Sequence, residues 1–136
     1  YEKKYFHNEL KKMCNAHNKK YYPKYKKWCD EYFYINHRNE SRGIGGIFFD
    51  YKMDDWEKDF LFVKDVGKFF VYILKKIIRK KMFKKWTKLE KDIQLLKRGR
   101  YAEFNLMYDR GTKFGLNSGG NTDAILMSMP PTAKWK

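Results

Sequence analysis

Residues 26–50 read KKWCDEYFYINHRNESRGIGGIFFD, and this stretch says more about the fold than any other part of the chain. Its first third is aromatic and predicts a buried helix. A polar turn follows, in which His37, Arg38, Glu40 and Arg42 lie close together in sequence. Glycines then break the helical pattern, and the short apolar run 47–49 predicts a strand that ends on a carboxylate. The order predicts that a core element delivers a cluster of charged groups to one place.

The bulk properties predict a single globular domain over residues 1–136 with an excess of positive charge. Hydrophobic residues make up 43% of the 136 residues, enough to build a core, so we do not expect disorder. The 31 basic and 16 acidic residues give a net charge of +15, which favours an anionic partner: nucleic acid, an acidic membrane face or a polycarboxylate. Two cysteines do not make a disulfide framework, so a reducing compartment is expected. No apolar run is long enough to be a transmembrane segment.

Four helices are predicted before residue 100. The first spans roughly Tyr5 to Ala16, and the second opens near Pro23, whose missing N–H does no harm in a first turn. The third follows Asp54 or Asp55, either of which can cap its start, and the fourth stops near Gly99. The third helix is expected to bury an apolar stripe at four-three spacing. Its members are Trp56, Phe60, Val63, Gly67, Phe70, Leu74 and Ile77.

From residue 101 onward the apolar period changes to two. Alternation over 101–109 and the short runs 112–116 and 124–129 predict three strands. The connections between them are short, which implies an antiparallel meander. Helices first and strands later predict an α+β fold, with an antiparallel β-sheet flanked by helices.

The histidines are the first candidates for chemistry. His7 falls on the first helix and His37 in the polar turn, but a lone histidine is more often a surface or hydrogen-bonded residue than a ligand. Two histidines cannot by themselves complete a catalytic metal site, which usually needs three protein ligands. His17 is expected at the surface.

The charged residues after His37 admit two interpretations. Arg38, Glu40 and Arg42 form either an intramolecular network that holds the turn or an anion site, because guanidinium groups match carboxylates bidentately. The basic run 97–100 also has two interpretations, since cations at a helix C-terminus suit the helix dipole without any further role.

Two blocks of the chain resemble oxygen-dependent coproporphyrinogen III oxidase. The family signature is Lys-x-Trp-Cys, two residues, three aromatics, an aliphatic, x-His-Arg-x-Glu-x-Arg-Gly, then Gly-Gly and Phe-Phe-Asp, and residues 26–50 meet every fixed position. Residues 98–129 resemble a second block, from Arg-Gly-Arg-Tyr-x-Glu-Phe-Asn-Leu to Ile-Leu-Met-Ser-Met-Pro-Pro. The resemblance covers nearly the whole chain except roughly 54–96, and it corresponds to the C-terminal half of a full enzyme.

The resemblance implies a haem-biosynthesis oxidoreductase. Such an enzyme converts two propionate side chains of coproporphyrinogen III to vinyl groups, giving protoporphyrinogen IX, while molecular oxygen is consumed as co-substrate and carbon dioxide is released. No organic cofactor is implied. The implied fold is a flat antiparallel sheet with helices on both faces, in a homodimer formed through roughly Tyr101–Lys136. A cytoplasmic location is expected, with an organelle as the alternative.

The resemblance also assigns the metal and catalytic positions. His7 and His37 match the last two of four histidines in a bacterial divalent-metal set, while the metal requirement itself stays open. The family's proposed catalytic histidine and aspartate would precede Tyr1. No catalytic residue is therefore expected in this chain, and the chain alone is expected to be inactive.

Substrate contact is implied for a glycine loop. Gly119, Gly120 and Asn121 match a Gly-Gly-Arg loop of the family, with Asn121 in place of the arginine. The charge-assisted contact would be lost, so either another basic side chain such as Lys113 compensates or binding weakens. Tyr51 likewise replaces a family aspartate.

The residues also admit two other classes of function. A basic nucleic-acid-binding module would use residues 75–91 as its footprint, but zinc-finger spacing, RNP-type strands and basic-zipper heptads are absent from the sequence. A basic helix docked on anionic lipid is the other alternative, and the expected burial of the apolar stripe counts against it. The oxidase family is preferred to both.

Overall fold

The computed structural model describes all 136 residues, and its backbone divides into two compact units. The α1–α3 unit comprises Tyr1–Tyr32 and Ile44–Lys85, and the α4–α6 unit comprises Phe33–Gly43 and Trp86–Lys136. The expectation of a single domain stays a prediction. No helix, the 26-residue α3 included, is long and apolar enough to cross a lipid bilayer.

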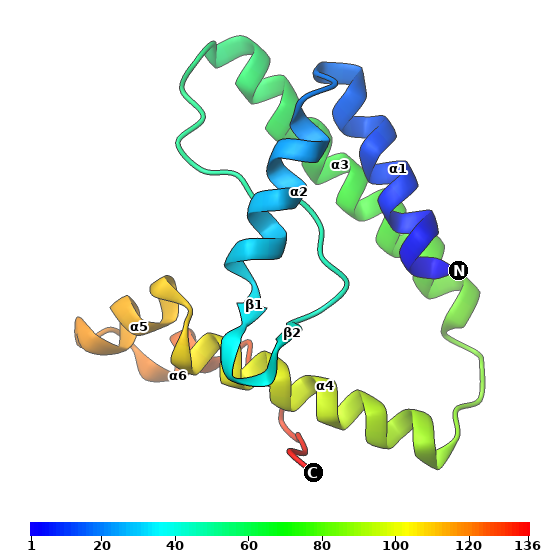
Figure 1. Cartoon of the computed structure of the whole chain (residues 1–136), viewed down its shortest axis with the longest axis vertical. Coiled ribbons are helices and arrows are strands. Elements are labelled where there is room, and N and C mark those ends of the chain that lie inside the picture. Colours follow the sequence, from blue (N-terminus) through cyan, green and yellow to red (C-terminus); the bar gives the residue numbers. More distant parts are fainter. The chain divides into compact units, whose positions relative to one another are not determined.

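The α1–α3 unit is built from α1 (Glu2–His17), α2 (Tyr21–Tyr32) and α3 (Trp56–Lys81). Helix α1 lies along α3 (Figure 1), and the two helices pack against each other. Asp55 caps α3 by accepting a hydrogen bond from the Lys58 N–H at 3.1 Å, as the sequence predicts. Four buried side chains form the core between these helices: Leu10, Cys14, Tyr25 and Phe62.

Most of the stripe predicted to be buried on α3 is exposed, and only Ile77 is half-buried. Trp56 is 74% exposed, Phe60 52% and Phe70 61%, whereas Phe62 is fully buried and Ile73 is 3% exposed. Helix α3 carries apolar residues on two faces, and α1 packs against only one of them. Periodicity alone cannot show which of two apolar faces packs against a neighbouring helix. The predicted buried face of α3 is therefore wrong.

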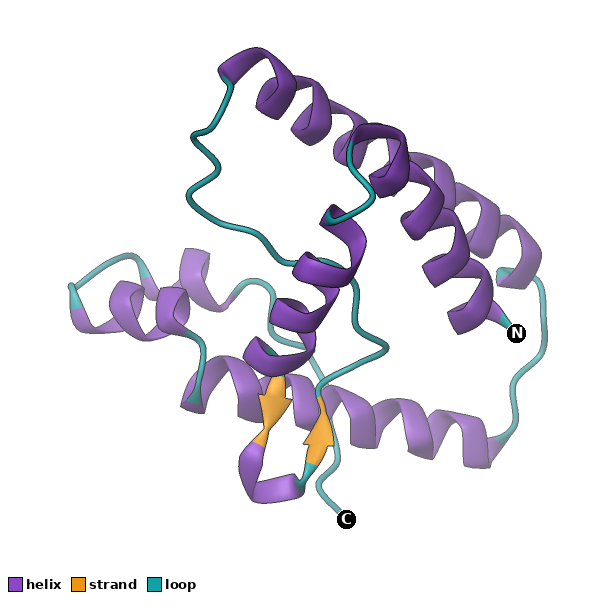
Figure 2. Ribbon diagram, turned by 45° about the horizontal axis from the view of Figure 1, so that its top comes forward, coloured by secondary structure: helices purple, strands orange, loops and turns teal.

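The α4–α6 unit combines a short hairpin with three helices. Strands β1 (Tyr34–Ile35) and β2 (Glu40–Ser41) pair antiparallel around the 3-10 turn η1 (Asn36–Arg38), and both strands are visible as arrows in Figure 2. Helices α4 (Lys88–Met107), α5 (Arg110–Asn117) and α6 (Thr122–Leu126) follow. Thr87 and Glu90 form a capping box at the start of α4.

The predicted meander is absent, although the α+β class is confirmed by helices together with a two-stranded antiparallel sheet. Residues 101–107 continue α4, and most of 112–116 and 124–129 fall in α5, α6 and the turn after α6. Asp109, expected at the end of the first strand, and Asn121, expected in the glycine loop, are the N-caps of α5 and α6. Residues 47–49 also form no strand; the Phe48 N–H donates to the Tyr25 carbonyl at 3.1 Å instead.

The C-terminal segment closes over α4 at a glycine. A Cβ at Gly99 would overlap the carbonyl oxygen of Lys134, so only glycine permits this approach. The Lys134 N–H donates to the Leu95 carbonyl at 3.0 Å, and its ammonium pairs with Asp92 at 2.5 Å. This packing contributes to the burial of Gly99.

Candidate functional site

The hairpin presents its charged turn to α4. Asn39 adopts the left-handed conformation (φ 51°), which an asparagine tolerates, and it ends η1. At the base of the hairpin the Arg42 N–H donates to the Phe33 carbonyl at 3.0 Å. The Arg42 guanidinium lies 4.2 Å from the Phe33 ring centroid and 5.2 Å from those of Tyr101 and Phe104. These cation–π contacts hold the hairpin on α4.

Glu103 is the centre of the resulting ion cluster, and its side chain is only 9% exposed. Arg38 donates two hydrogen bonds to Glu103, from Nε to Oε2 at 3.0 Å and from a terminal guanidinium nitrogen to Oε1 at 2.7 Å. Arg100 adds a third at 3.2 Å. The Arg38 guanidinium is the largest cause that lowers the pKa of Glu103 to about 2, so the carboxylate is ionised near neutral pH.

Glu40 is a second carboxylate in the same cluster. It accepts from the Lys97 ammonium at 2.5 Å and from Arg100 Nε at 2.6 Å. The bond from Lys97 outweighs partial burial and, with Arg100, lowers the pKa of Glu40. Arg100 therefore bridges the two carboxylates, and the charged turn is tied to α4 at both of its ends.

His37 connects the cluster to a phenol. Its Nε2 lies 2.8 Å from Glu103 Oε2 and its Nδ1 lies 2.8 Å from the Tyr108 hydroxyl, with the two rings stacked. An ionised carboxylate only accepts, so in the neutral imidazole Nε2–H donates to Glu103, and Nδ1 accepts from Tyr108. The result is a carboxylate–imidazole–hydroxyl chain that fixes the orientation of Tyr108.

His7, in the other unit, holds the glycine-rich segment. Its Nε2 lies 2.8 Å from the Ile44 carbonyl oxygen, and its Nδ1 lies 3.1 Å from the Tyr22 hydroxyl. Gly45 follows in the left-handed region (φ 79°), and a Cβ there would come within 2.9 Å of Asp30 Oδ1. The arrangement explains why a glycine follows Ile44 at this point.

Comparison with known proteins places this site in a family. The sequence model of coproporphyrinogen III oxidase matches residues 1–136. The chain belongs to the coproporphyrinogen III oxidase family. It is 55% identical to an oxygen-dependent coproporphyrinogen-III oxidase of Rickettsia bellii (strain OSU 85-389), 54% to that of Rickettsia rickettsii (strain Sheila Smith) and 53% to that of Rickettsia akari (strain Hartford). Each alignment spans 131 residues, 96% of this chain and 47% of the relative, so the chain spans about half the length of these relatives.

The family's expected metal ligands are engaged by protein groups. Both ring nitrogens of His7 and of His37 have hydrogen-bonding partners, and the two histidines belong to different units. No group of three or more His, Cys, Asp and Glu side chains with metal-binding geometry is present. The metal assignment stays a prediction, and a metal at His37 would have to displace Glu103 or Tyr108. His17, expected at the surface, is 19% exposed at its side chain and bonds to Asp65 at 3.0 Å.

The family's expected substrate loop joins α5 to α6. Gly119 adopts a left-handed conformation (φ 73°) just after the C-terminus of α5, as glycine commonly does. The Gly120 N–H donates to the Gly115 carbonyl at 3.1 Å, and Asn121 Oδ1 accepts from the Ala124 N–H at 3.1 Å. Capping therefore accounts for the loop's conformation, and substrate contact there stays a prediction.

Two partners in these units were not identified from the sequence. The alternating pattern predicts strands at Glu103 and Tyr108. Lys97, Arg100 and Glu103 nevertheless recur at three-residue spacing, which is the helical signal that indicates the cluster. In the α1–α3 unit, Lys52 and Asp59 form an ion pair that is about nine-tenths buried. Burial alone would lower the pKa of Lys52, but the bonds to Asp59 and Tyr21 outweigh it and raise that pKa.

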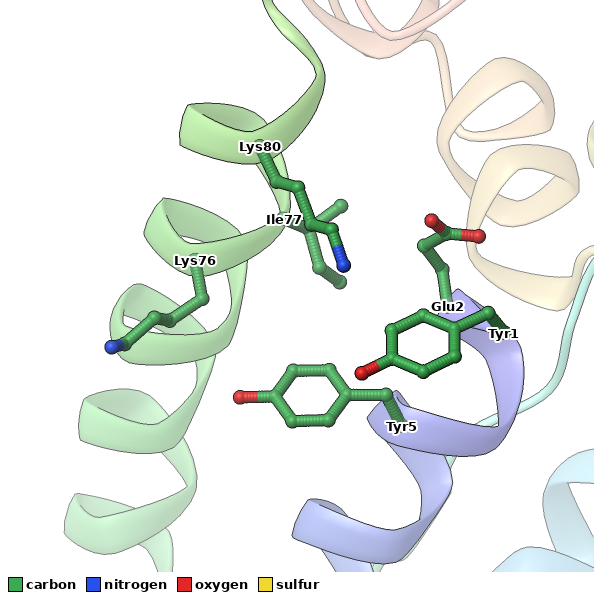
Figure 3. Close-up of a pocket in the computed structure, with 6 residues that line it drawn as sticks. All are labelled: Tyr1, Glu2, Tyr5, Lys76, Ile77 and Lys80. Atoms are coloured by element: carbon green, nitrogen blue, oxygen red, sulfur yellow. The ribbon is translucent and has the colours of Figure 1, made fainter.

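A small pocket lies between α1 and α3. Tyr1, Glu2 and Tyr5 face Lys76, Ile77 and Lys80 across it, as Figure 3 shows. The Lys80 ammonium lies 4.4 Å from the centroid of the Tyr1 ring, and Lys81 pairs with Glu2 at 2.7 Å. Its volume of about 240 Å³ is below the usual range for small-molecule sites, and charged contacts between the two helices account for its walls.

Proposed function

We propose that this chain is part of an oxygen-dependent coproporphyrinogen III oxidase of haem biosynthesis. The observation that carries the proposal is the family match through all 136 residues, including the hairpin and the α4 residues that bond to it. The reaction would convert two propionate groups of coproporphyrinogen III to vinyl groups, with oxygen as co-substrate and without an organic cofactor.

The charge of the chain supports a polycarboxylate substrate. The net charge of +15 favours binding of a tetracarboxylate, and the aromatic content suits a large apolar ring system. Arg38 is already bonded to Glu103, so we propose that Arg38 positions the hairpin and does not bind substrate. The intramolecular-network interpretation of the turn is therefore favoured over the anion-site interpretation.

The loop at Gly119, Gly120 and Asn121 is proposed to contact a substrate carboxylate. Asn121 uses its Oδ1 to cap α6, which leaves its amide N–H groups to donate to such an oxygen. We also propose three further properties on the family resemblance. These are a homodimer through Tyr101–Lys136, a divalent metal at His7 and His37, and a cytoplasmic location. A nucleic-acid role gains no support from the relatives' names.

Binding and turnover test the proposal separately. Coproporphyrin III, the stable oxidised tetracarboxylate, should quench the tryptophan fluorescence of the chain, whereas its tetramethyl ester should not. Asn121→Arg should tighten binding of the acid by roughly tenfold, because a charged donor forms a stronger hydrogen bond to a carboxylate. Equal binding of acid and ester would contradict the proposal.

Turnover of coproporphyrinogen III is expected to need the rest of the family sequence. We expect no aerobic decarboxylation by the 136-residue chain, and activity when it is co-expressed with the remaining half of the Rickettsia bellii relative. Turnover by the chain alone would show that the catalytic groups lie within it. Inactivity of the co-expressed pair, despite a stable complex, would count against a catalytic role.

A further inference from the structure

Helix α3 and the residues around it have an uneven distribution of charge. Residues 54–65 hold five acidic and two basic side chains, whereas residues 66–85 hold eight basic and none acidic. The basic residues are Lys68, Lys75, Lys76, Arg79, Lys80, Lys81, Lys84 and Lys85. The helix dipole favours cations only in the last turn, which accounts for Arg79, Lys80 and Lys81 but not for the others.

The same segment exposes a row of apolar side chains. Val71 is 64% exposed, Leu74 42%, Ile78 46% and Met82 58%, and Phe83 just beyond the helix is 87% exposed. Spacings of three and four residues put the first four on one side of the helix. Phe69 and Ile73, on a different face, are the residues turned toward the core of the unit.

Basic side chains flank this apolar row. At 100° per residue, Lys68, Lys75 and Arg79 follow one edge of it. Lys81 pairs with Glu2 and Lys68 with Asp65, but Lys75, Arg79, Lys84 and Lys85 have no carboxylate partner. Four unpaired cations thus lie next to five exposed apolar side chains, at the opposite end of α3 from its acidic start.

We propose that residues 68–85 dock on an anionic lipid surface. An amphipathic helix lies in the membrane interface when apolar side chains enter the headgroup boundary and flanking cations meet anionic lipid. Clusters of four to eight Lys and Arg residues bind anionic lipid by this electrostatic attraction. The expectation that counted against lipid docking was burial of the stripe, but Phe70 and Leu74 of that stripe are exposed and only Ile77 is half-buried.

A phosphate backbone is a poorer match for the same surface. Nucleic acid would satisfy the cations, but it offers nothing to aliphatic side chains such as Leu74 and Ile78. The combination of unpaired cations with an aliphatic row therefore favours lipid. The proposal does not depend on oxidase activity, since it concerns a surface outside the glutamate-centred cluster.

Vesicle co-sedimentation of the 136-residue protein tests the proposal. We expect binding to phosphatidylcholine vesicles that contain phosphatidylglycerol, weak binding to phosphatidylcholine alone, and loss of binding as salt is raised. The triple variant Lys75→Gln, Arg79→Gln, Lys84→Gln should weaken binding on the order of a hundredfold. Phe83→Ser, beyond the end of the helix, should weaken it about tenfold at unchanged charge.

A matched control separates local docking from net charge. Lys11→Gln, Lys19→Gln, Lys20→Gln removes the same three charges from exposed positions on and after α1, and should leave binding nearly unchanged. Circular dichroism should show equal helicity in all variants. The proposal is overturned if the control loses as much affinity as the α3 variant, if Phe83→Ser has no effect, or if a duplex oligonucleotide binds more tightly and displaces the vesicles.

Discussion

At the scale of single residues, Glu103 is the common hydrogen-bond acceptor for side chains of the hairpin and of α4. It accepts hydrogen bonds from Arg38, Arg100 and His37 while its side chain is only 9% exposed. Removing the charge would deprive the half-buried Arg38 guanidinium of its carboxylate partner, whereas Arg100 would keep its bond to Glu40. The carboxylate, and not an arginine, is therefore the residue whose loss the cluster tolerates least.

Glu103→Gln should lower the free energy of unfolding by about 2 kcal/mol near neutral pH, because it weakens several charge-assisted hydrogen bonds at once. Urea denaturation followed by circular dichroism measures the loss. Glu31→Gln, at a side chain 65% exposed with a long ion pair at 3.8 Å, is the matched control and should change stability by less than about 0.5 kcal/mol. Equal effects of the two variants would contradict the central role of Glu103.

The same residue sets a pH dependence. Its folded pKa of about 2 is below the ordinary value of 4.5, so its contribution is complete above 4.5 and is lost as the pH falls toward 2. The difference in stability between wild type and Glu103→Gln should therefore shrink through this window. A difference that stays constant down to the lower limit would show that the carboxylate's charge is not what stabilises the cluster.

Tyr51 is strained where the family is expected to have aspartate. It adopts a left-handed conformation (φ 49°) and is 84% exposed, so its ring gains little from packing. Asparagine and aspartate tolerate that conformation better than tyrosine. Tyr51→Asn should raise the free energy of unfolding by about 0.5–1 kcal/mol. The gain would be measured as a higher midpoint of thermal unfolding. Tyr34→Asn, which sits in a strand, should not share this gain.

At the scale of elements, α3 distinguishes its two apolar faces. Phe62→Ala should lower the free energy of unfolding by about 3–5 kcal/mol, because Phe62 is fully buried against Tyr21, Tyr25 and Phe49. Phe60→Ala makes the same chemical change two residues away, at a side chain 52% exposed, and should cost less than about 1 kcal/mol. Similar losses at both positions would mean that both faces of α3 are covered in solution.

The elements also show what local patterns can predict. Asp55 and Pro23 mark the start of α3 and the first turn of α2 correctly, because capping and helix-start preferences are local. Alternation over 101–109 misled because α4 buries Arg100, Glu103 and Asn105 together with Ala102 and Phe104. A helix that buries polar residues has no clean apolar period. Arg100 and Glu103 find partners in the distant hairpin, while Asn105 donates to the Tyr101 carbonyl within α4.

At the scale of the whole molecule, the candidate site was half predictable. His37, Arg38 and Glu40 could be selected from one contiguous motif, but their partners lie about sixty residues away in sequence. No local rule connects Arg38 to Glu103. The family resemblance identified both sequence blocks but not the contacts between them. The two hydrogen bonds from Arg38 to Glu103 are therefore known only from the structure.

The two units should respond to mutation separately, since each is compact by itself. Cys14 and Cys29 are both buried in the α1–α3 unit, and burial raises the pKa of the Cys14 thiol to about 11, so labelling by a thiol reagent requires opening of that unit. Phe62→Ala should therefore speed labelling strongly, in proportion to its lost stability. Glu103→Gln lies in the α4–α6 unit and should leave the labelling rate within about twofold of wild type. Equal acceleration by both variants would show that the two units unfold as one cooperative body.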